Sequence, residues 1–356
     1  MPKIRVLVVE DSLTVRKRLV EVLSSDPNFE VVGEGENGQQ AIELCQALRP
    51  DVITLDMHLP ILDGVSATEH IMGHFPTPIL IVSSSTNRGD LFKTYDALAA
   101  GAVDVLEKPT SDEADGAWER RFLSAVKLVS RIRVITHIRA RLGSVGRAPT
   151  PRSDAPLPVT KSAERGHSLI AVGASTGGPG ALVEVLRGIP LGVPAVMLIV
   201  LHIDEPFSSA FADWLSSQTS HPVSYARGGE TLAEARGRVF MAPPGQHLAV
   251  ASGKLWLSSA PERHSCRPSV DVLFETLARD CARDVVAALL TGMGRDGADG
   301  LLALRRAGAH TIAQDEATSV IYGMPREAAL LGAAERILPL FEIGAAMTRV
   351  VAKGGR

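Results

Sequence analysis

One short stretch constrains this chain more than any other: an apolar run, a glycine-rich turn and an apolar-periodic segment. The run is Leu169 to Ala174, and Ser175 opens the turn. Apolar residues then recur at helical spacing, at Ala181, Leu182, Val185, Leu186 and Ile189. The pattern predicts a strand, a tight turn and a helix, with Pro179 at the first helical position. Ser175 would then lie beside a helix N-terminus, whose free N–H groups favour a developing anion.

The turn itself has three interpretations. Ser175 can be a nucleophile exposed on a strand–turn–helix elbow. Alternatively, Gly173, Gly177 and Gly178 can bring the backbone close to a bound phosphate, or the turn can be purely structural. The spacing G-x-x-x-G-G matches neither the dinucleotide fingerprint nor the P-loop. The turn alone leaves all three interpretations open.

Length and composition limit the class of protein. A chain of 356 residues is long enough for two or three domains, and 45% hydrophobic with 22% charged residues is typical of globular proteins. The net charge of −3 predicts no nucleic-acid partner. No signal peptide and no apolar run of about 18 residues is present, so we expect no direct membrane insertion. The three widely spaced cysteines, Cys45, Cys266 and Cys281, favour a reducing, cytoplasmic location.

The first domain, residues 1 to about 125, alternates short apolar runs with helical patterns. The predicted strands are Ile4 to Val9, Val31-Val32, Val52 to Leu55, Ile79 to Val82 and Val103 to Leu106. Helices are expected at Ser12 to Leu23 and around Gln39 to Leu48. This alternation predicts a parallel, doubly wound sheet whose functional groups gather at the carboxyl ends of the strands.

Polar residues follow these strands at the expected edge. They are Glu10, Asp11, Asp56, Ser83 and Lys108. Three converging carboxylates repel one another, and a divalent cation with oxygen ligands, Mg²⁺, would relieve that repulsion. The metal and Lys108 could neutralise a phosphoryl group on the central carboxylate, with the Ser83 hydroxyl as an additional donor.

These residues resemble the receiver domain of bacterial response regulators. The matching stretches are Val8 to Ser12, Asp51 to Pro60 with Asp63-Gly64, and Glu107-Lys108-Pro109. The resemblance implies that Asp56 is the phospho-acceptor and that Lys108 contacts the phosphoryl group. It also implies a Mg²⁺ site made by Glu10, Asp11, the Asp56 side chain and the His58 carbonyl. Glu10 stands where an aspartate is often found. Among the hydroxyls from Ser83 to Thr86, Ser83 is the expected switch residue because it directly follows the strand.

A connector, residues 126 to 166, separates the two halves of the chain. We expect a helix from Ala125 to Leu142 with several arginines on its solvated side. Apolar periodicity is lost from Gly143 to Gly166, where Pro149, Pro151, Pro156 and Pro158 fall within ten residues. This stretch is typical of a semi-extended linker.

The second domain, residues 167 to 350, again alternates strands and helices. Further strands are expected at Ala195 to Leu201, Val239 to Ala242, Val285 to Leu290 and Thr311 to Ala313, with a hairpin at Leu248 to Leu257. Helices are expected at Ser269 to Cys281 and Leu301 to Ala307. The pattern predicts a second α/β sheet, in which Ser175, His202 and Asp296 each follow the end of a strand.

These three residue types could act together. A serine hydroxyl is a poor nucleophile until an imidazole takes its proton, and a carboxylate fixes the imidazole tautomer. His247, His264 and His310 are rival bases, and His247 is a lesser candidate for lining the same cleft. The chain order Ser, His, Asp differs from the nucleophile–acid–histidine order of α/β-hydrolases.

Longer motifs in this half resemble the catalytic domain of the chemotaxis protein-glutamate methylesterases, the CheB family, over residues 168 to 345. They are Gly173 to Pro179, Pro268 to Asp271, Leu290 to Ala298 and Ala313 to Pro325. The resemblance implies a Rossmann-like α/β domain with Ser175 as nucleophile, His202 as base and Asp296 as orienting acid. It also places an oxyanion-stabilising backbone N–H at Met293. Leu201 replaces a glutamine that often precedes the histidine.

The resemblance implies a phosphorylation-activated serine esterase. It would demethylate glutamate methyl esters, and deamidate glutamines, on methyl-accepting chemotaxis receptors, with a chemotaxis-type histidine kinase as phosphodonor. The triad would need no cofactor, and the unphosphorylated receiver would cover the Ser175 cleft. Three other functions stay open: a non-enzymatic response regulator whose second domain binds a nucleotide or phosphorylated ligand at residues 173 to 178, a DNA-binding output domain, and a scaffold on receptor arrays.

Overall fold

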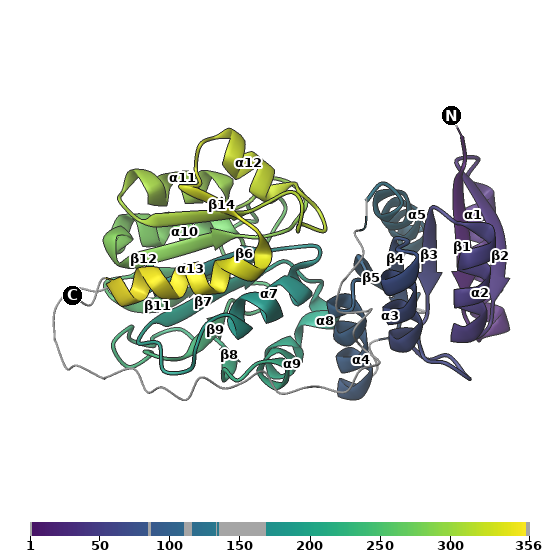
Figure 1. The fold of residues 1–356 in the computed structure, drawn as a ribbon, viewed down its shortest axis with the longest axis horizontal. Helices are drawn as coiled ribbons and strands as arrows, with labels where there is room; N and C mark the ends of the chain where they lie inside the picture. Colours follow the sequence, from purple (N-terminus) through teal and green to yellow (C-terminus); the bar gives the residue numbers. More distant parts are fainter. Residues whose placement is uncertain (1, 85–86, 110–115, 133, 135–168, 354–356) are drawn as a thin grey trace.

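A computed structural model describes residues 2–84, 87–109, 116–132, 134 and 169–353. Two α/β domains lie side by side, each built on a parallel sheet (Figure 1). The predicted linker from Gly143 to Gly166 lies outside the described residues. No helix in the described ranges combines the length and apolar character that a bilayer crossing requires.

The first domain is a five-stranded parallel sheet in the order β2-β1-β3-β4-β5. Its strands are β1 (Ile4–Val9), β2 (Phe29–Gly35), β3 (Val52–Leu55), β4 (Ile79–Ser83) and β5 (Asp104–Glu107). Its helices are α1 (Leu13–Ser25), α2 (Gly38–Leu48), α3 (Gly64–His74), α4 (Arg88–Ala99) and α5 (Ala117–Val129). This strand order is that of flavodoxin-like folds, so the predicted doubly wound sheet is confirmed.

The last helix of this domain differs from the prediction. Helix α5 begins at Ala117 and ends at Val129, and residues 130–132 and 134 are not helical, whereas we expected a helix from Ala125 to Leu142. The Trp118 and Phe122 rings stack with centroids 4.9 Å apart and are buried with Val129 in one apolar cluster. Burial of this aromatic pair therefore fixes the helix further toward the N-terminus, and the helix crosses position 125.

The second domain has a seven-stranded parallel sheet in the order β14-β13-β12-β6-β7-β9-β8. The strands are β6 (Leu169–Ala174), β7 (Val196–Leu201), β8 (Val223–Tyr225), β9 (Val239–Met241), β12 (Val285–Leu289), β13 (His310–Gln314) and β14 (Arg336–Leu338). A separate antiparallel hairpin pairs β10 (His247–Ala251) with β11 (Lys254–Ser258). The chain runs outward from β6 and returns to its other side at β12, so a topological switch point lies between these two strands. Ligand sites of open parallel sheets lie at such points.

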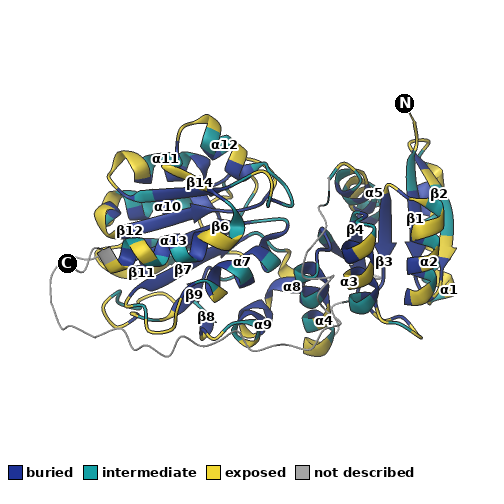
Figure 2. Cartoon of the chain, viewed as in Figure 1, coloured by how far each residue is buried: buried dark blue, intermediate teal, exposed yellow. Residues whose placement is uncertain are grey.

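Helices cover both faces of the second sheet. They are α7 (Gly178–Arg187), α8 (Glu205–Ser208), α9 (Phe211–Gln218), α10 (Val270–Asp280), α11 (Ala298–Arg306), α12 (Met324–Leu330) and α13 (Leu340–Lys353). A short 3₁₀ helix (Ala282–Asp284) precedes β12. The central strands β6, β7 and β12 are apolar and buried along their whole length, as expected for strands covered on both faces, and Figure 2 shows them in dark blue.

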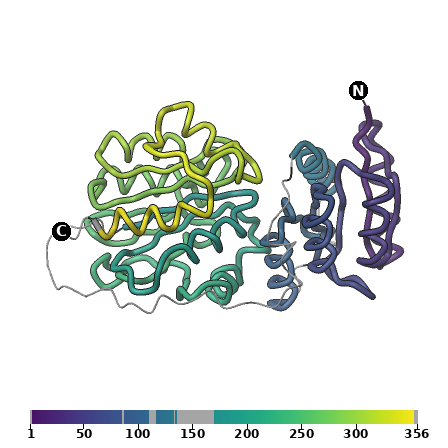
Figure 3. The backbone as a smooth tube through the Cα atoms, in the orientation of Figure 1, coloured from purple at the N-terminus to yellow at the C-terminus, as the bar shows by residue number. Residues whose placement is uncertain are grey.

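The two domains are joined by packing of α4 against α7 and α9, and these helices lie at the junction in Figures 1 and 3. The Tyr95 ring lies 5.2 Å from that of Phe211 and 5.5 Å from that of Trp214, measured between centroids. Trp214 Nε1 donates to Asp96 Oδ1 over 2.8 Å, and the Tyr95 hydroxyl donates to the Phe207 carbonyl. One apolar core therefore runs from the first domain into the second.

Candidate active site

Ser175 lies on the predicted turn between β6 and α7. Its backbone N–H donates to the Thr291 carbonyl over 3.0 Å, and its own carbonyl accepts from Gly178 over 2.6 Å. A Cβ atom on Gly292 would lie 2.7 Å from the Ser175 Cβ, so the loop after β12 passes directly beside the serine. Pro179 lies one residue further into the helix than we expected, because α7 begins at Gly178.

Protein side chains pack closely against the glycines of this turn. A Cβ on Gly173 would lie 2.3 Å from a Val270 methyl, and one on Gly178 would lie 2.5 Å from a Leu201 methyl. Gly177 has a φ of 77° and would meet Val320 at 2.6 Å. Side chains of the protein itself thus pack against these three glycines. These contacts explain the glycines without a bound phosphate.

His202 and Asp296 meet at the same edge of the sheet. His202 directly follows β7, and its N–H donates to the Ala174 carbonyl over 3.0 Å. Its Nε2 lies 2.9 Å from Asp296 Oδ2. The other ring nitrogen, Nδ1, faces the Cys266 sulfur at 3.7 Å. The loop after β12 therefore supplies the carboxylate that holds the imidazole.

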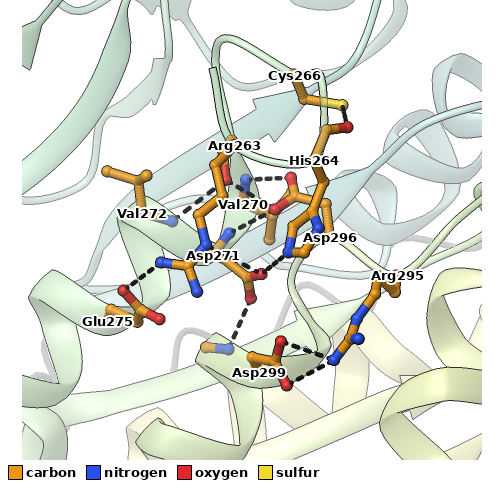
Figure 4. A network of polar contacts seen from close by, with 12 residues as sticks. Arg263, His264, Cys266, Val270, Asp271, Val272, Glu275, Arg295, Asp296 and Asp299 are labelled. Carbon is orange, nitrogen blue, oxygen red and sulfur yellow. Dashed lines mark hydrogen bonds and ion pairs between the residues drawn. The ribbon is translucent and has the colours of Figure 1, made fainter. Parts of the chain in front are cut away.

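The Asp296 carboxylate is 2% exposed and lies at the N-terminus of α10 (Figure 4). Its Oδ1 accepts from the Ser269 hydroxyl over 2.7 Å and from the Asp271 N–H over 3.2 Å. Its Oδ2 accepts from the Val270 N–H over 2.7 Å. The helix thus offers the buried carboxylate its unpaired N–H groups and the positive end of its dipole.

These contacts set the charges of the pair. Burial alone would raise the pKa of Asp296, but hydrogen bonds from His202, Ser269 and Val270 lower it below its ordinary value. Burial would lower the pKa of His202, but the Asp296 carboxylate and the Cys266 sulfur raise it to about 9. The arrangement therefore favours a carboxylate next to an imidazolium.

Ser175 and His202 line one cavity of about 380 Å³. The first domain forms part of its wall with Leu98, Val103, Asp104 and Val105. Across the described residues, no hydrogen bond joins the Ser175 hydroxyl to His202. The serine and its expected base thus share a site that the first domain partly covers.

A second polar cluster lies at the carboxyl edge of the first sheet. One carboxylate oxygen each from Glu10, Asp11 and Asp56 lies within 4.8 Å of the others. Lys108 Nζ lies 2.8 Å from Glu10 Oε2 and 3.1 Å from Asp56 Oδ2. Burial and the Asp56 charge raise the pKa of Glu10 to about 7, although Lys108 opposes them. Negative charge therefore exceeds what Lys108 balances, and an oxygen-binding divalent cation fits this cluster.

Comparison with known proteins assigns the two domains. The family model described as CheB methylesterase matches residues 170–347, and the one described as response regulator receiver domain matches residues 6–114. A protein-glutamate methylesterase/protein-glutamine glutaminase of Nitrosospira multiformis is 42% identical over 355 residues, covering 99% of this chain and 98% of the relative. This chain belongs to the CheB methylesterase family. Its N-terminal domain is a response-regulator receiver.

Two further proteins are similar to this chain in sequence. A protein-glutamate methylesterase/protein-glutamine glutaminase 2 of Pseudomonas aeruginosa is 42% identical over 358 residues, covering 99% of this chain and 98% of the relative. The crystal structure of the Thermotoga maritima CheB methylesterase catalytic domain is 31% identical and covers 52% of this chain and 98% of that domain, with a TM-score of 0.49.

Met293, the expected oxyanion donor of this CheB domain, lies in the loop beside Ser175. Its side chain is 50% exposed, and it does not line the cavity. The neighbouring Gly292 is fixed by hydrogen bonds with Ile321, Gly323 and Met324. Within the described ranges, the Met293 N–H makes no hydrogen bond to other protein groups. A free donor is therefore present next to the serine.

The rival histidines are engaged elsewhere. His247 is buried, with Nδ1 accepting from the Ser269 N–H over 3.1 Å, and it does not line the cavity. His264 Nε2 lies 3.1 Å from Asp271 Oδ2. His310 Nδ1 lies 2.8 Å from Glu335 Oε2 on the surface. Of the four histidines that we considered, His202 alone lines the Ser175 cavity.

Two receiver residues have informative side chains. The Ser83 hydroxyl is buried and has no hydrogen-bond partner among the described residues. It is therefore available to donate a hydrogen bond to a phosphoryl oxygen. His58 directs its Nε2 to Asp90 Oδ1 at 2.7 Å, so its side chain does not serve the acidic cluster. Our expectation for His58 concerned its carbonyl and stays a prediction. Ser85 and Thr86 lie outside the described residues.

The sequence analysis missed Ser269. This residue caps α10, with its hydroxyl accepting from the Val272 N–H over 3.4 Å, and it donates to Asp296. A serine directly before a helical apolar pattern signals an N-cap. Nothing in the sequence indicates that the same hydroxyl reaches a carboxylate 27 residues away.

Ser269→Ala tests this double role. We expect an activity loss of about tenfold, because the Asp296 carboxylate loses a charge-assisted hydrogen bond. We also expect a stability loss of about 1 kcal/mol from the missing cap. The matched control is Asn37→Ala, which removes the cap of α2 in the receiver, where Asn37 accepts from the Gln40 N–H. Thermal unfolding should show a similar cost for both variants, with activity reduced in Ser269→Ala alone.

Proposed function

We propose that this protein is a phosphorylation-activated serine esterase that hydrolyses glutamate methyl esters, and deamidates glutamines, on chemotaxis receptors. One observation carries the proposal: an ionised Asp296 at the N-terminus of α10 lies 2.9 Å from His202, which lines the same cavity as Ser175. The names of the relatives, methylesterase and glutaminase, supply the substrate class.

The proposed reaction is a two-step acyl transfer. The Ser175 oxygen attacks the γ-carbonyl carbon of the ester while Nδ1 of His202 takes the hydroxyl proton. Nε2–H keeps its hydrogen bond to Asp296, which stabilises the imidazolium. The C–O bond to the methoxy group then breaks, and the imidazolium protonates the leaving group to methanol. Water, deprotonated by the same imidazole, hydrolyses the acyl-enzyme to glutamate and free Ser175. A glutamine substrate follows the same path and releases ammonia.

The Met293 N–H is proposed to stabilise the tetrahedral oxyanion. Met293→Pro removes this N–H, and we expect kcat to fall about 10²–10³-fold. Met293→Leu keeps the N–H and should retain nearly full activity, because the side chain lies outside the cavity. Equal losses in the two variants, with both folded by circular dichroism, would contradict the assignment.

The receiver is proposed to carry the phosphoryl group on Asp56. Glu10, Asp11 and Asp56, with the His58 carbonyl, would hold Mg²⁺. When bound, this ion neutralises the charge that develops during phosphoryl transfer. Burial lowers the pKa of Lys108, but Asp56 and Glu10 raise it above its ordinary value, so its ammonium remains charged to bind the phosphoryl oxygens. Ser83 would donate its unpaired hydroxyl.

The proposed partners are methyl-accepting chemotaxis receptors as substrates and a chemotaxis-type histidine kinase as phosphodonor. We also propose a cytoplasmic location. Support comes from Cys45, Cys266 and Cys281, which are all free thiols and suit a reducing compartment.

Methanol release from membranes that carry methylated receptors tests the function directly. We expect release by the full chain, and faster release with Mg²⁺ and a small phosphodonor such as acetyl phosphate. Deamidation is read as ammonia release from receptors with glutamine at the methylation sites. A folded protein that binds receptors but releases no methanol under either condition would instead support the scaffold alternative.

A further inference from the structure

The base nitrogen of the candidate triad faces a thiol. Asp296 occupies Nε2 of His202, so Nδ1 is the nitrogen left to take the serine proton. The Cys266 sulfur lies 3.7 Å from Nδ1, and Cys266 lines the same cavity as Ser175. Among the described residues, no hydrogen bond joins the Ser175 hydroxyl to His202. The sulfur therefore lies where the serine hydroxyl must compete for Nδ1.

The orientation of the Cys266 thiol allows its sulfur to accept a hydrogen bond from Nδ1. Cys266 Sγ also lies 3.4 Å from the His264 carbonyl oxygen, a contact drawn in Figure 4. A carbonyl oxygen can only accept a hydrogen bond, so the thiol must be the donor in this contact. A thiol proton directed at that carbonyl leaves the sulfur lone pairs to accept from a protonated Nδ1. With Nε2–H bound to Asp296, both ring nitrogens then carry protons, and such an imidazolium cannot take a proton from Ser175.

The position of Cys266 is fixed by a tight turn. Arg263 and Cys266 exchange two backbone hydrogen bonds of 2.9 and 3.1 Å. Between them, His264 and Ser265 adopt positive φ values of 52° and 59°. Arg263 and His264 bind Glu275 and Asp271 of α10 at 2.7 and 3.1 Å, respectively. The turn that carries the thiol is thus attached to the same helix that holds Asp296.

Together these contacts suggest a role for the thiol in the proposed reaction. We propose that Cys266 is a positioning residue that competes with Ser175 for Nδ1 of His202 and thereby limits the basal esterase activity. This inference rests on the proposed function. For the triad to become active, Nδ1 of His202 must lose its contact with the Cys266 sulfur and form a hydrogen bond with the Ser175 hydroxyl.

Other charged groups near the imidazole come from several elements. Asp296 from the loop after β12 contacts it directly, and Arg263 and Asp271 act on Asp296. Five further charged residues line the cavity: Asp104, Asp204, Glu205, Glu262 and Arg267. Within the described ranges, none of these five forms a hydrogen bond or an ion pair with the His202 ring. The thiol and Asp296 are therefore the groups that set its protonation.

Cys266→Ala in the full chain tests the inference. Because the Asp296 carboxylate and the Cys266 sulfur raise the pKa of His202 to about 9, removal of the sulfur should lower that pKa. A lower pKa leaves more neutral imidazole at pH 7. We therefore expect basal methanol release at pH 7 to rise by about tenfold, the change that one pKa unit would give. The acidic limb of kcat/KM should move to lower pH.

Two variants control the test. Cys266→Ser keeps a hydroxyl that can donate to the His264 carbonyl and accept from Nδ1, as the thiol does, and should behave more like the parent than like the alanine variant. Cys281→Ala removes another half-buried thiol, at the end of α10 and outside the cavity, and should leave rate and profile unchanged. A reduced rate in Cys266→Ala with an unmoved pH profile would show that the thiol serves packing, and an unchanged rate and profile would equally overturn the inference.

A readout independent of activity separates this inference from the proposed function. Histidine NMR titration of the full chain, with the His202 signal assigned from its loss in His202→Gln, reports the imidazole pKa directly. A downward shift in Cys266→Ala with no methanol release by the parent supports the contact while rejecting the esterase. No shift, with a parent that releases methanol, rejects the role of Cys266 alone.

Discussion

Ser175→Ala is expected to abolish methanol release, with a loss of kcat of about 10⁴-fold or more. The physical reason is that the variant loses the proposed nucleophile, the hydroxyl placed beside the Gly292 backbone and the N-terminus of α7. His202 and Asp296 keep their hydrogen bond in this variant, so the protein should remain folded. The measurement is single-turnover methanol release from methylated receptor membranes.

The matched control for this prediction is Ser265→Ala. Ser265 lines the same cavity but makes no hydrogen bond to His202 or Asp296 among the described residues. Its loss should change the rate less than about threefold. Substantial esterase activity in Ser175→Ala, comparable with that of Ser265→Ala, would remove Ser175 as the nucleophile.

Removal of residues 1–166 is expected to raise the basal esterase rate by about 5- to 150-fold, the range of typical coupling free energies. In the full chain, Leu98 and the segment from Val103 to Val105 form part of the cavity wall. We therefore expect a receptor segment to displace that wall before it reaches Ser175. Phosphorylation of Asp56 should raise the rate in the same direction by weakening the contact.

Full-chain variants check that the effect comes from the domain contact. Trp214→Phe keeps the aromatic packing against Tyr95 but loses the hydrogen bond to Asp96, so it should raise the basal rate by a smaller factor. Arg88→Gln removes an exposed ion pair with Asp213 and should have little effect, since such pairs contribute little. A well-folded fragment with an unchanged or lower rate would contradict occlusion by the receiver.

The positions of the functional side chains along the chain could be predicted from sequence. Apolar runs that end at Ala174, Leu201 and Leu55 place Ser175, His202 and Asp56 directly after buried strands. Within each sheet, parallel strands bring their carboxyl ends to one edge, so the meeting of Ser175 and His202 in the second domain follows from local pattern and fold class together. The predicted helix from Ala125 to Leu142 was wrong in its bounds, because the stacked Trp118–Phe122 pair, buried against distant strands, fixes α5 earlier in the chain. Residues 135–142 of that prediction lie outside the described residues.

The sequence by itself determined two parallel α/β domains and the residue types at their carboxyl edges, because strand and helix periodicity are local properties. Tertiary structure alone decided that Nε2 of His202 binds Asp296 and that Nδ1 faces Cys266. It also decided that Ser269 and α10 hold Asp296, and that the receiver walls the cavity. These contacts join segments tens of residues apart, and their distances depend on how whole elements pack, which local sequence patterns do not encode.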